Sequence, residues 1–120
     1  MRSALLVKAT AGQDAPERCS QAFTVSSVAA LSGVRVSLWL TGEAVWLAVP
    51  GRAAAFELPH SAPMDALLAD VLASGQVTVC TQCAVRRGLT EADLLPGVRV
   101  AGAAVFVSEA LEDDVQALVY

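Results

Sequence analysis

Short apolar runs alternate with amphipathic segments along the chain, and this alternation predicts strands separated by helices. Apolar runs of strand length occupy residues 4–9, 34–40, 76–80, 98–101 and 115–120. The clearest helical spacing lies between the second and third of these runs, where Gly75 ends a helix whose apolar positions are Met64, Leu67, Leu68, Val71 and Leu72. Shorter helices or helical turns are expected at residues 43–49, 83–87, 90–95 and 103–111.

The first helix has a recognisable start. Asp14 stands three residues before Glu17, with Pro16 between them, so the Asp14 carboxylate is expected to cap the free N–H groups of this helix. The helix should run to Leu31 and bury one face, made of Cys19, Ala22, Phe23, Ser26 and Ala30. Residues 52–63 lack a clean period and are expected to form a loop with a turn of helix.

These elements predict an α/β fold in one domain over residues 1–120. Strands that alternate with helices and are apolar on both faces form a parallel sheet covered on two sides, with right-handed crossovers. Ligands bind such sheets at the carboxyl ends of the strands. Three of those ends contain a glycine and the fourth contains two cysteines, in residues 10–13, 41–43, 102–103 and 80–83. Gly12 and Gly42 are therefore candidate contacts for an anion or a partner.

Composition and charge limit the classes of protein to which the chain can belong. The chain has 120 residues, of which 55% are apolar and 17% charged, and this excludes a disordered protein. A small domain with so little charge is expected to leave apolar surface for contact between subunits, so we expect a homo-oligomer. The net charge of −4 argues against direct binding to nucleic acid.

The sequence also bears on the compartment. The longest uncharged stretch, residues 19–34, is too short and too polar to span a membrane, and no signal peptide is visible. Three cysteines are an odd number for a set of structural disulfides. We therefore expect a cytoplasmic protein whose close cysteine pair serves redox, sulfur or metal chemistry rather than a structural bridge.

Cys80 and Cys83 are the strongest candidates for chemistry. A strand is expected to end at Cys80, and a short helix to begin near Cys83. The free N–H groups of a helix start stabilise a thiolate, and Arg86 and Arg87 add positive charge one turn away. The sequence thus predicts a nucleophilic Cys80, with Cys83 close enough to attack a mixed disulfide or to accept sulfur. The alternative is that both are small apolar residues packed at the end of a strand.

The remaining candidates carry weaker signals. One Cys-x-x-Cys with a single distant histidine does not supply the usual four zinc ligands, so we expect no metal and no cofactor. Cys19 is expected to pack on a helix face, and His60 to lie in a loop. Trp39 and Trp46 are expected in the core or an interface. Arg86 and Arg87 either end a short helix or contact an anionic sulfur donor or a partner. Dinucleotide, P-loop and serine-hydrolase motifs are absent.

The order of elements and the stretch Val77-Thr78-Val79-Cys80-Thr81-Gln82-Cys83-Ala84-Val85-Arg86-Arg87-Gly88-Leu89 resemble the DsrE/DsrF-like family of small sulfurtransferases, which includes TusD-like and YchN-like branches. Two later segments, 95–102 and 115–120, are similar too. The resemblance implies a three-layer α/β/α fold with a five-stranded parallel sheet, assembly into trimers or hexamers, and a cysteine that carries persulfide sulfur. The TusD-like pattern places that cysteine at Cys80, and the YchN-like pattern places it nearer Cys83.

Three hypotheses of function follow. The first is a cytoplasmic sulfur carrier, in which Cys80 accepts sulfur from a donor protein, holds it as a persulfide and passes it to an acceptor thiol, with Cys83 resolving or stabilising. The second is a thiol–disulfide or peroxide-reducing protein that uses the same pair, although a thioredoxin normally carries its Cys-x-x-Cys after the first strand. The third is a non-catalytic oligomeric binding module in which the cysteines only pack.

Overall fold

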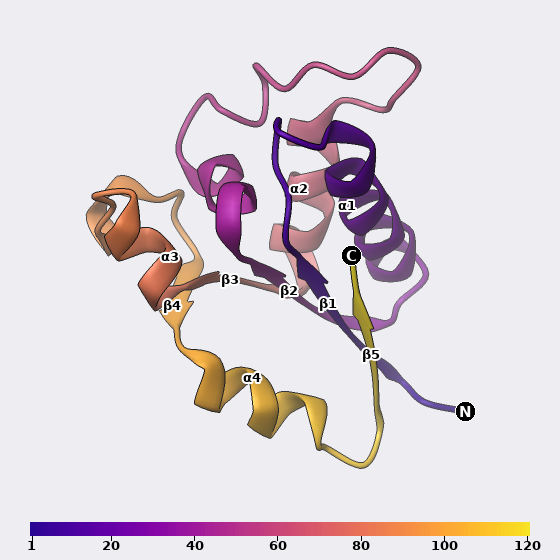
Figure 1. Cartoon of the computed structure of the whole chain (residues 1–120). Coiled ribbons are helices and arrows are strands. Elements are labelled where there is room, and N and C mark those ends of the chain that lie inside the picture. Colours follow the sequence, from indigo (N-terminus) through magenta and orange to yellow (C-terminus); the bar gives the residue numbers. More distant parts are fainter.

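The computed structural model describes residues 1–120 and contains five strands, four α-helices and two 3-10 helices (Figure 1). The strands are β1 (Ala4–Ala9), β2 (Arg35–Leu40), β3 (Gln76–Cys80), β4 (Val98–Ala101) and β5 (Val115–Val119). The α-helices are α1 (Pro16–Leu31), α2 (Met64–Ser74), α3 (Thr81–Arg86) and α4 (Ala103–Ala110). The 3-10 helices are η1 (Gly42–Ala48) and η2 (Glu91–Asp93).

All five strands pair in parallel, in the spatial order β4-β3-β2-β1-β5. Parallel neighbours need crossover connections, and the helices supply them on both faces of the sheet: α1 and α2 lie on one face and α4 on the other (Figure 1). The predicted five-stranded parallel sheet and α/β/α layering are confirmed. The carboxyl ends of all strands consequently meet at one edge of the sheet.

The hydrophobic core lies between the sheet and the pair α1–α2. Alternate residues of each strand point to this side, and the central strands supply Val7, Ala9, Val36, Leu38, Leu40, Val77 and Val79. Helix α1 contributes Phe23, which is fully buried, and α2 contributes Leu68 and Val71. This large apolar layer fixes the sheet and therefore the relative positions of the strand ends.

The opposite face of the sheet is more polar than the sequence pattern predicts. The side chains that alternate onto it include Lys8, Ser37, Thr78 and Arg99. Leu6 and Trp39 are the large apolar side chains that are fully buried there. Helix α4, which covers this face, has no buried residue. The expectation of strands that are apolar on both faces was therefore wrong, because one face is closed by apolar packing and the other largely by hydrogen bonds and ion pairs.

Several predicted elements agree closely with the structure, and three details differ. Ala15, not Asp14, is the residue before α1, and the Asp14 carboxylate accepts a hydrogen bond from the Gly12 N–H at 2.8 Å instead of capping the helix. The segment predicted as a helix from Glu43 is the 3-10 helix η1. Helix α3 begins at Thr81, two residues earlier than predicted, so it starts directly after Cys80.

Candidate functional site

Cys80 is the last residue of β3, and Cys83 lies in the first turn of α3. The cysteines differ in accessibility: Cys80 is half-buried, whereas Cys83 is only 7% exposed. Both are free thiols. The more accessible cysteine is thus the one at the carboxyl end of the strand, and the second cysteine is buried.

The surroundings of Cys80 favour its thiolate. Burial acts to raise the pKa of this thiol, but hydrogen bonds from the backbone N–H and the thiol of Cys83 and from the backbone N–H of Gln82 act in the opposite direction, helped by the charge of Lys8. The net result is a Cys80 pKa below its ordinary value of 9.0. A lowered pKa makes more of the nucleophilic thiolate available at neutral pH.

Cys83 is oriented by the segment that begins η1. Its Sγ accepts a hydrogen bond from the backbone N–H of Gly42 at 3.2 Å. Because the Cys83 thiol in turn donates toward Cys80, the three groups form a chain of hydrogen bonds from Gly42 through Cys83 to Cys80. In this arrangement Cys83 acts as a hydrogen-bond donor to Cys80.

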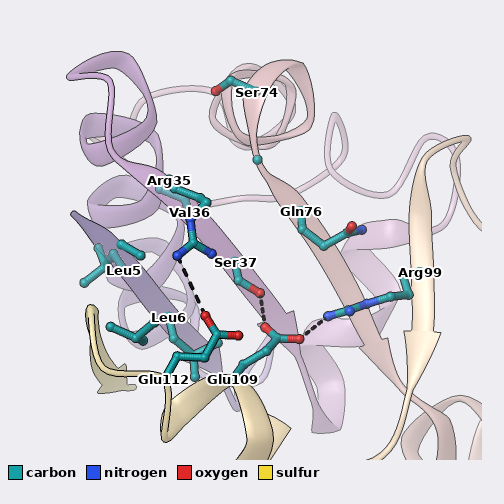
Figure 2. Close-up of a pocket in the computed structure, with 13 residues that line it drawn as sticks. Leu5, Leu6, Arg35, Val36, Ser37, Ser74, Gln76, Arg99, Glu109 and Glu112 are labelled. Carbon is teal, nitrogen blue, oxygen red and sulfur yellow. Dashed lines mark hydrogen bonds and ion pairs between the residues drawn. The ribbon is translucent and has the colours of Figure 1, made fainter. Parts of the chain in front are cut away.

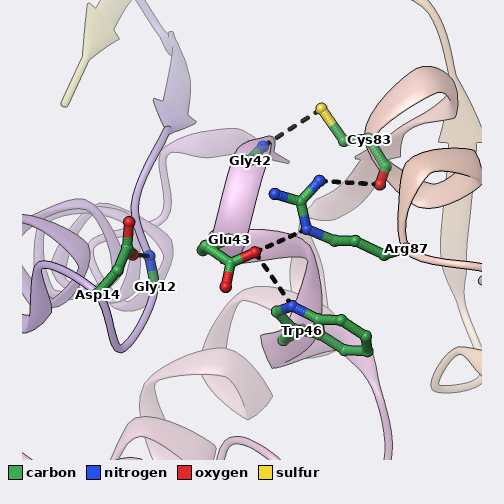
Figure 3. Close-up of polar contacts among 7 residues, drawn as sticks. All are labelled: Gly12, Asp14, Gly42, Glu43, Trp46, Cys83 and Arg87. Atoms are coloured by element: carbon green, nitrogen blue, oxygen red, sulfur yellow. Dashed lines mark hydrogen bonds and ion pairs between the residues drawn. The ribbon is translucent and has the colours of Figure 1, made fainter.

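An ion pair between Glu43 and Arg87 also links η1 to the end of α3 (Figure 3). Arg87 Nε donates to Glu43 Oε2 at 2.8 Å, and another guanidinium nitrogen of Arg87 donates to the carbonyl oxygen of Cys83 at 3.1 Å. Trp46 Nε1 donates to the same Glu43 carboxylate oxygen at 3.2 Å. Residues 42 and 43 therefore hold Cys83 at both its sulfur and, through Arg87, its carbonyl.

Two glycines allow this close packing of backbone. A Cβ at Gly12 would lie 2.5 Å from the carbonyl oxygen of Glu43, and a Cβ at Gly42 would lie 2.8 Å from that of Thr10. Gly42 also has a φ of +55°, which favours glycine. Backbone therefore approaches closely at both glycines. At Gly102, in the turn after β4, a Cβ would meet no heavy atom within 4 Å, so this turn shows no such approach.

The candidate contact residues differ in whether their hydrogen-bonding groups are available to a ligand or a partner. Gly12 and Gly42 both use their N–H groups internally, toward Asp14 and Cys83 respectively. Arg87 is committed to Glu43 and Cys83, so it supports the cysteine turn rather than standing ready for a ligand. Arg86 is exposed and forms no ion pair, and of the two arginines it alone is open to a partner.

Four further residues lie where the sequence places them. Cys19 is buried in α1, and burial together with the charge of Asp14 raises its pKa to about 12, so it is a packing residue with an unreactive thiol. His60 is exposed in the loop before α2. Trp39 is fully buried in the sheet, and Trp46 stacks under Arg52, whose guanidinium lies 4.5 Å from the ring centroid.

Lys8 was not among the residues that the sequence singled out. It is the only lysine of the chain, and it lies in β1 within an otherwise apolar run. Lys8 pairs with Trp39, which pairs with Thr78, and Cys80 is two residues farther along β3. All four side chains consequently belong to the same face of the sheet. A lone lysine interrupting an apolar strand was the available signal.

A cavity lies at the other end of the sheet. It has a volume of about 440 Å³ and is bordered by the amino-terminal parts of β1–β3 and by α4 (Figure 2). Its charged groups satisfy one another: Arg99 pairs with Glu109 at 2.5 Å, and Arg35 with Glu112 at 3.8 Å. Glu109 also accepts hydrogen bonds from Ser37 and Trp39. This cluster attaches α4 to the sheet and is separate from the cysteine turn.

Neither a membrane helix nor a metal cluster is evident. None of the helices combines the length and the apolar character needed to cross a bilayer. No three histidine, cysteine or acidic side chains come together in a way that would hold a metal ion.

Comparison with known proteins agrees with the fold. The crystal structure of the ychN protein from E. coli matches with a TM-score of 0.81 at 18% sequence identity, over 100% of both chains. The structure of MTH1491 from Methanobacterium thermoautotrophicum, described as a protein of unknown function, matches with a TM-score of 0.69 at 14% identity, over 98% of this chain and 99% of that one. No curated protein matches the sequence. The model of the DsrE/DsrF-like family matches residues 3–116, nearly the whole length, and the chain therefore belongs to the DsrE/DsrF-like family.

Proposed function

We propose that the protein is a sulfur carrier that holds sulfane sulfur as a persulfide on Cys80. The observation that carries the proposal is the accessible Cys80 thiol at the end of β3, whose pKa is lowered mainly by hydrogen bonds from the adjacent turn despite partial burial. Membership in the DsrE/DsrF-like family supports sulfur relay as the general role. Residues 1–120 would act as one domain, in the reducing cytoplasm, where a free thiol persists.

The chemistry requires a nucleophile and a stabilised anion. The Cys80 thiolate attacks the outer sulfur of a donor persulfide, R–S–S⁻, and forms Cys80–S–S⁻ while the donor leaves as the thiolate R–S⁻. An acceptor thiolate then attacks the outer sulfur of Cys80–S–S⁻, and the Cys80 thiolate is regenerated. No net oxidation occurs in either step. The Cys83 donor and the N–H groups at the start of α3 stabilise the negative charge of Cys80 before and after transfer.

Donor and acceptor are expected to be proteins that meet Cys80 at the molecular surface, and the carrier itself is expected to assemble as a homotrimer or hexamer. Exposed apolar side chains support assembly. Helix α4 has no buried residue although six of its eight residues are apolar, and Val107 and Leu111 are 52% and 77% exposed. Surfaces of this kind usually become interfaces.

Sulfur loading tests the proposal directly. The wild-type protein, C80S, C83S and C19S would be incubated with a polysulfide, and the intact mass of each would be measured before and after reduction. We expect one added sulfur atom on the wild type and on C19S, removed by a thiol reductant, and none on C80S. Equal loading of C80S and wild type would contradict the assignment, and loss of loading only in C83S would move the carrier position to Cys83.

A second candidate function, thiol–disulfide exchange or peroxide reduction, is favoured by the unequal exposure of the two cysteines. An accessible Cys80 next to a buried Cys83 suits attack by the first sulfur and resolution by the second. In the peroxide reaction, Cys80–S⁻ and Cys83–SH would form a disulfide while the peroxide is reduced to water. Mild peroxide followed by peptide mapping distinguishes the two functions. Rapid Cys80–Cys83 bridging without any persulfide after polysulfide treatment would favour this candidate over the carrier.

A further inference from the structure

Lys8 has no acidic partner, although the chain has more acidic than basic residues. All three ion pairs of the structure are made by arginines, at positions 35, 87 and 99. The Lys8 side chain is half-buried and forms no hydrogen bond, and its ammonium lies 4.9 Å from the ring centroid of Phe106 in α4. An aromatic face attracts a cation but leaves its N–H donors free, so the ammonium can still bind an anion.

The position of this free cation relative to Cys80 follows from the strand register. Lys8 and Cys80 project from the same face of the sheet, on strands separated only by β2. The ammonium contacts the ring of Phe106, which lies in the first turn of α4. Helix α4 begins two residues after Ala101, and Ala101 is the β4 partner of Cys80. Phe106 also packs edge-on against Trp39 at 5.3 Å, so its ring is held in place. The ammonium is thus held over the same face of the sheet as Cys80, and its charge acts on the Cys80 thiol.

We propose that Lys8 is the anion-binding residue of the Cys80 site and that it binds the negatively charged sulfane sulfur brought to Cys80, whether a donor protein presents it as a persulfide or a small anion such as thiosulfate or polysulfide carries it. This inference rests on the proposed function for the identity of the ligand, but the binding of an anion in front of Cys80 stands on the geometry alone. The charge of the same ammonium would act on the outer sulfur of a Cys80 persulfide, which is one S–S bond, about 2.05 Å, farther from the chain than the thiol sulfur.

Two alkylating reagents that differ only in charge test the proposal. Iodoacetate is an anion and iodoacetamide is neutral, and both form a thioether when the thiolate displaces iodide. The rate of Cys80 alkylation by iodoacetate is divided by the rate with iodoacetamide, with both rates measured at one pH by peptide mass analysis. This ratio is independent of the fraction of thiolate. We expect this ratio to fall about threefold in K8M, the size of one partly screened charge interaction at several ångström. The ratio should stay near the wild-type value in K8R.

Matched controls separate a local effect from general charge and from misfolding. R86M removes an exposed, unpaired positive charge near the same turn and should change the ratio less than K8M does. In the wild type, 1 M salt should lower the ratio toward that of K8M, because the screening length then falls to about 3 Å. This measurement needs no variant.

An unchanged ratio in K8M, an equal fall in R86M, or a wild-type ratio insensitive to salt would overturn the proposal. Failure of the proposed function looks different. If C80S still loads sulfur while the alkylation ratio depends on Lys8 as described, the anion site stands and the sulfur-carrier assignment fails.

Discussion

The backbone N–H of Gly42 donates to Cys83 Sγ at 3.2 Å, and this bond joins the start of η1 to the cysteine turn 41 positions later in the chain. The bond gives Cys83 a defined role. A sulfur that accepts from Gly42 and donates to Cys80 stabilises the Cys80 thiolate without becoming the nucleophile itself. The two cysteines are therefore unequal members of one site.

Removal of the Cys83 thiol should make Cys80 less acidic. In C83A the side-chain hydrogen bond to Cys80 is lost while the backbone bonds remain, so we expect the Cys80 pKa to rise and its alkylation at pH 7 to slow several-fold. The pH dependence of iodoacetamide labelling measures this shift. C19A is the control, because Cys19 is buried in α1 and unreactive. A C83A profile that coincides with the wild type would contradict the hydrogen-bond chain.

The Glu43–Arg87 ion pair should contribute to stability as a coupled unit. Its arginine side chain is 19% exposed and its glutamate side chain 43%, so we expect E43Q to lower the free energy of unfolding by about 1 kcal/mol, near the upper end for partly solvated pairs. Urea unfolding of E43Q, R87Q and the double variant gives the coupling energy. E57Q, which alters an exposed side chain without an ion pair, should have no effect. Additive effects of E43Q and R87Q would mean that the contact carries no net energy.

Two glycine substitutions separate backbone strain from steric contact. Gly51 has a φ of +85° with no atom near its Cβ position, so G51A should cost only the strain of a positive φ, about 1 kcal/mol. Gly42 combines a positive φ with a Cβ position 2.8 Å from the Thr10 carbonyl oxygen, so G42A should cost roughly 1–3 kcal/mol more. Denaturant unfolding measures both. Equal costs would show that the backbone around η1 relaxes freely.

Glu109 should make the attachment of α4 sensitive to acid. Burial tends to raise its pKa, but hydrogen bonds from Ser37, Arg99 and Trp39 and the charge of Arg99 lower it below the ordinary value of 4.5. A lowered folded-state pKa stabilises the native state fully above pH 4.5, and this contribution is lost as the pH falls through the folded-state pKa. Stability measured between about pH 3 and 6 should therefore decline less steeply in E109Q than in the wild type. Parallel pH profiles would contradict this role.

Assembly should depend on α4 rather than on other exposed apolar residues. Val107 and Leu111 lie four positions apart on and just after α4, so the double variant V107D/L111D should reduce the oligomer to a smaller species in light scattering. V28D/L31D on α1 is the matched control, since these residues are 60% and 72% exposed. Dissociation by the α1 variant alone would place the interface on the opposite face of the sheet.

Most of the fold could be predicted from the sequence because the spacing of apolar residues is a local property. All five strands and the helix from Met64 could be predicted, since their periods and glycine boundaries lie within each segment. The helix start at Asp14 was misread because the Gly12 N–H, freed by the turn after β1, competes for the same carboxylate. The amount of polar surface on the α4 side was also missed, because it depends on which residues of separate strands share a face.

The candidate site could be predicted only in part for the same reason. Cys80 and Cys83 form a local motif, and its place at a strand end followed from the pattern. The partners of that motif come from distant segments: Arg87 is occupied by Glu43, and Lys8 is brought to the same face through the register of β1, β2 and β3. No local spacing encodes such a pairing, so these roles emerge only from the three-dimensional arrangement.

The register that places Lys8 and Cys80 on one face has a consequence for folding kinetics. Two parallel strands can pair only after the long segment between them has been brought into a closed loop, and this makes their pairing a slow step in folding. The lowered pKa of Cys80 draws on β1 and α3, so it can arise only once these separate crossovers have docked. In pulsed alkylation during refolding, Cys80 should therefore react slowly in early intermediates. The onset of fast Cys80 labelling then marks completion of the native sheet.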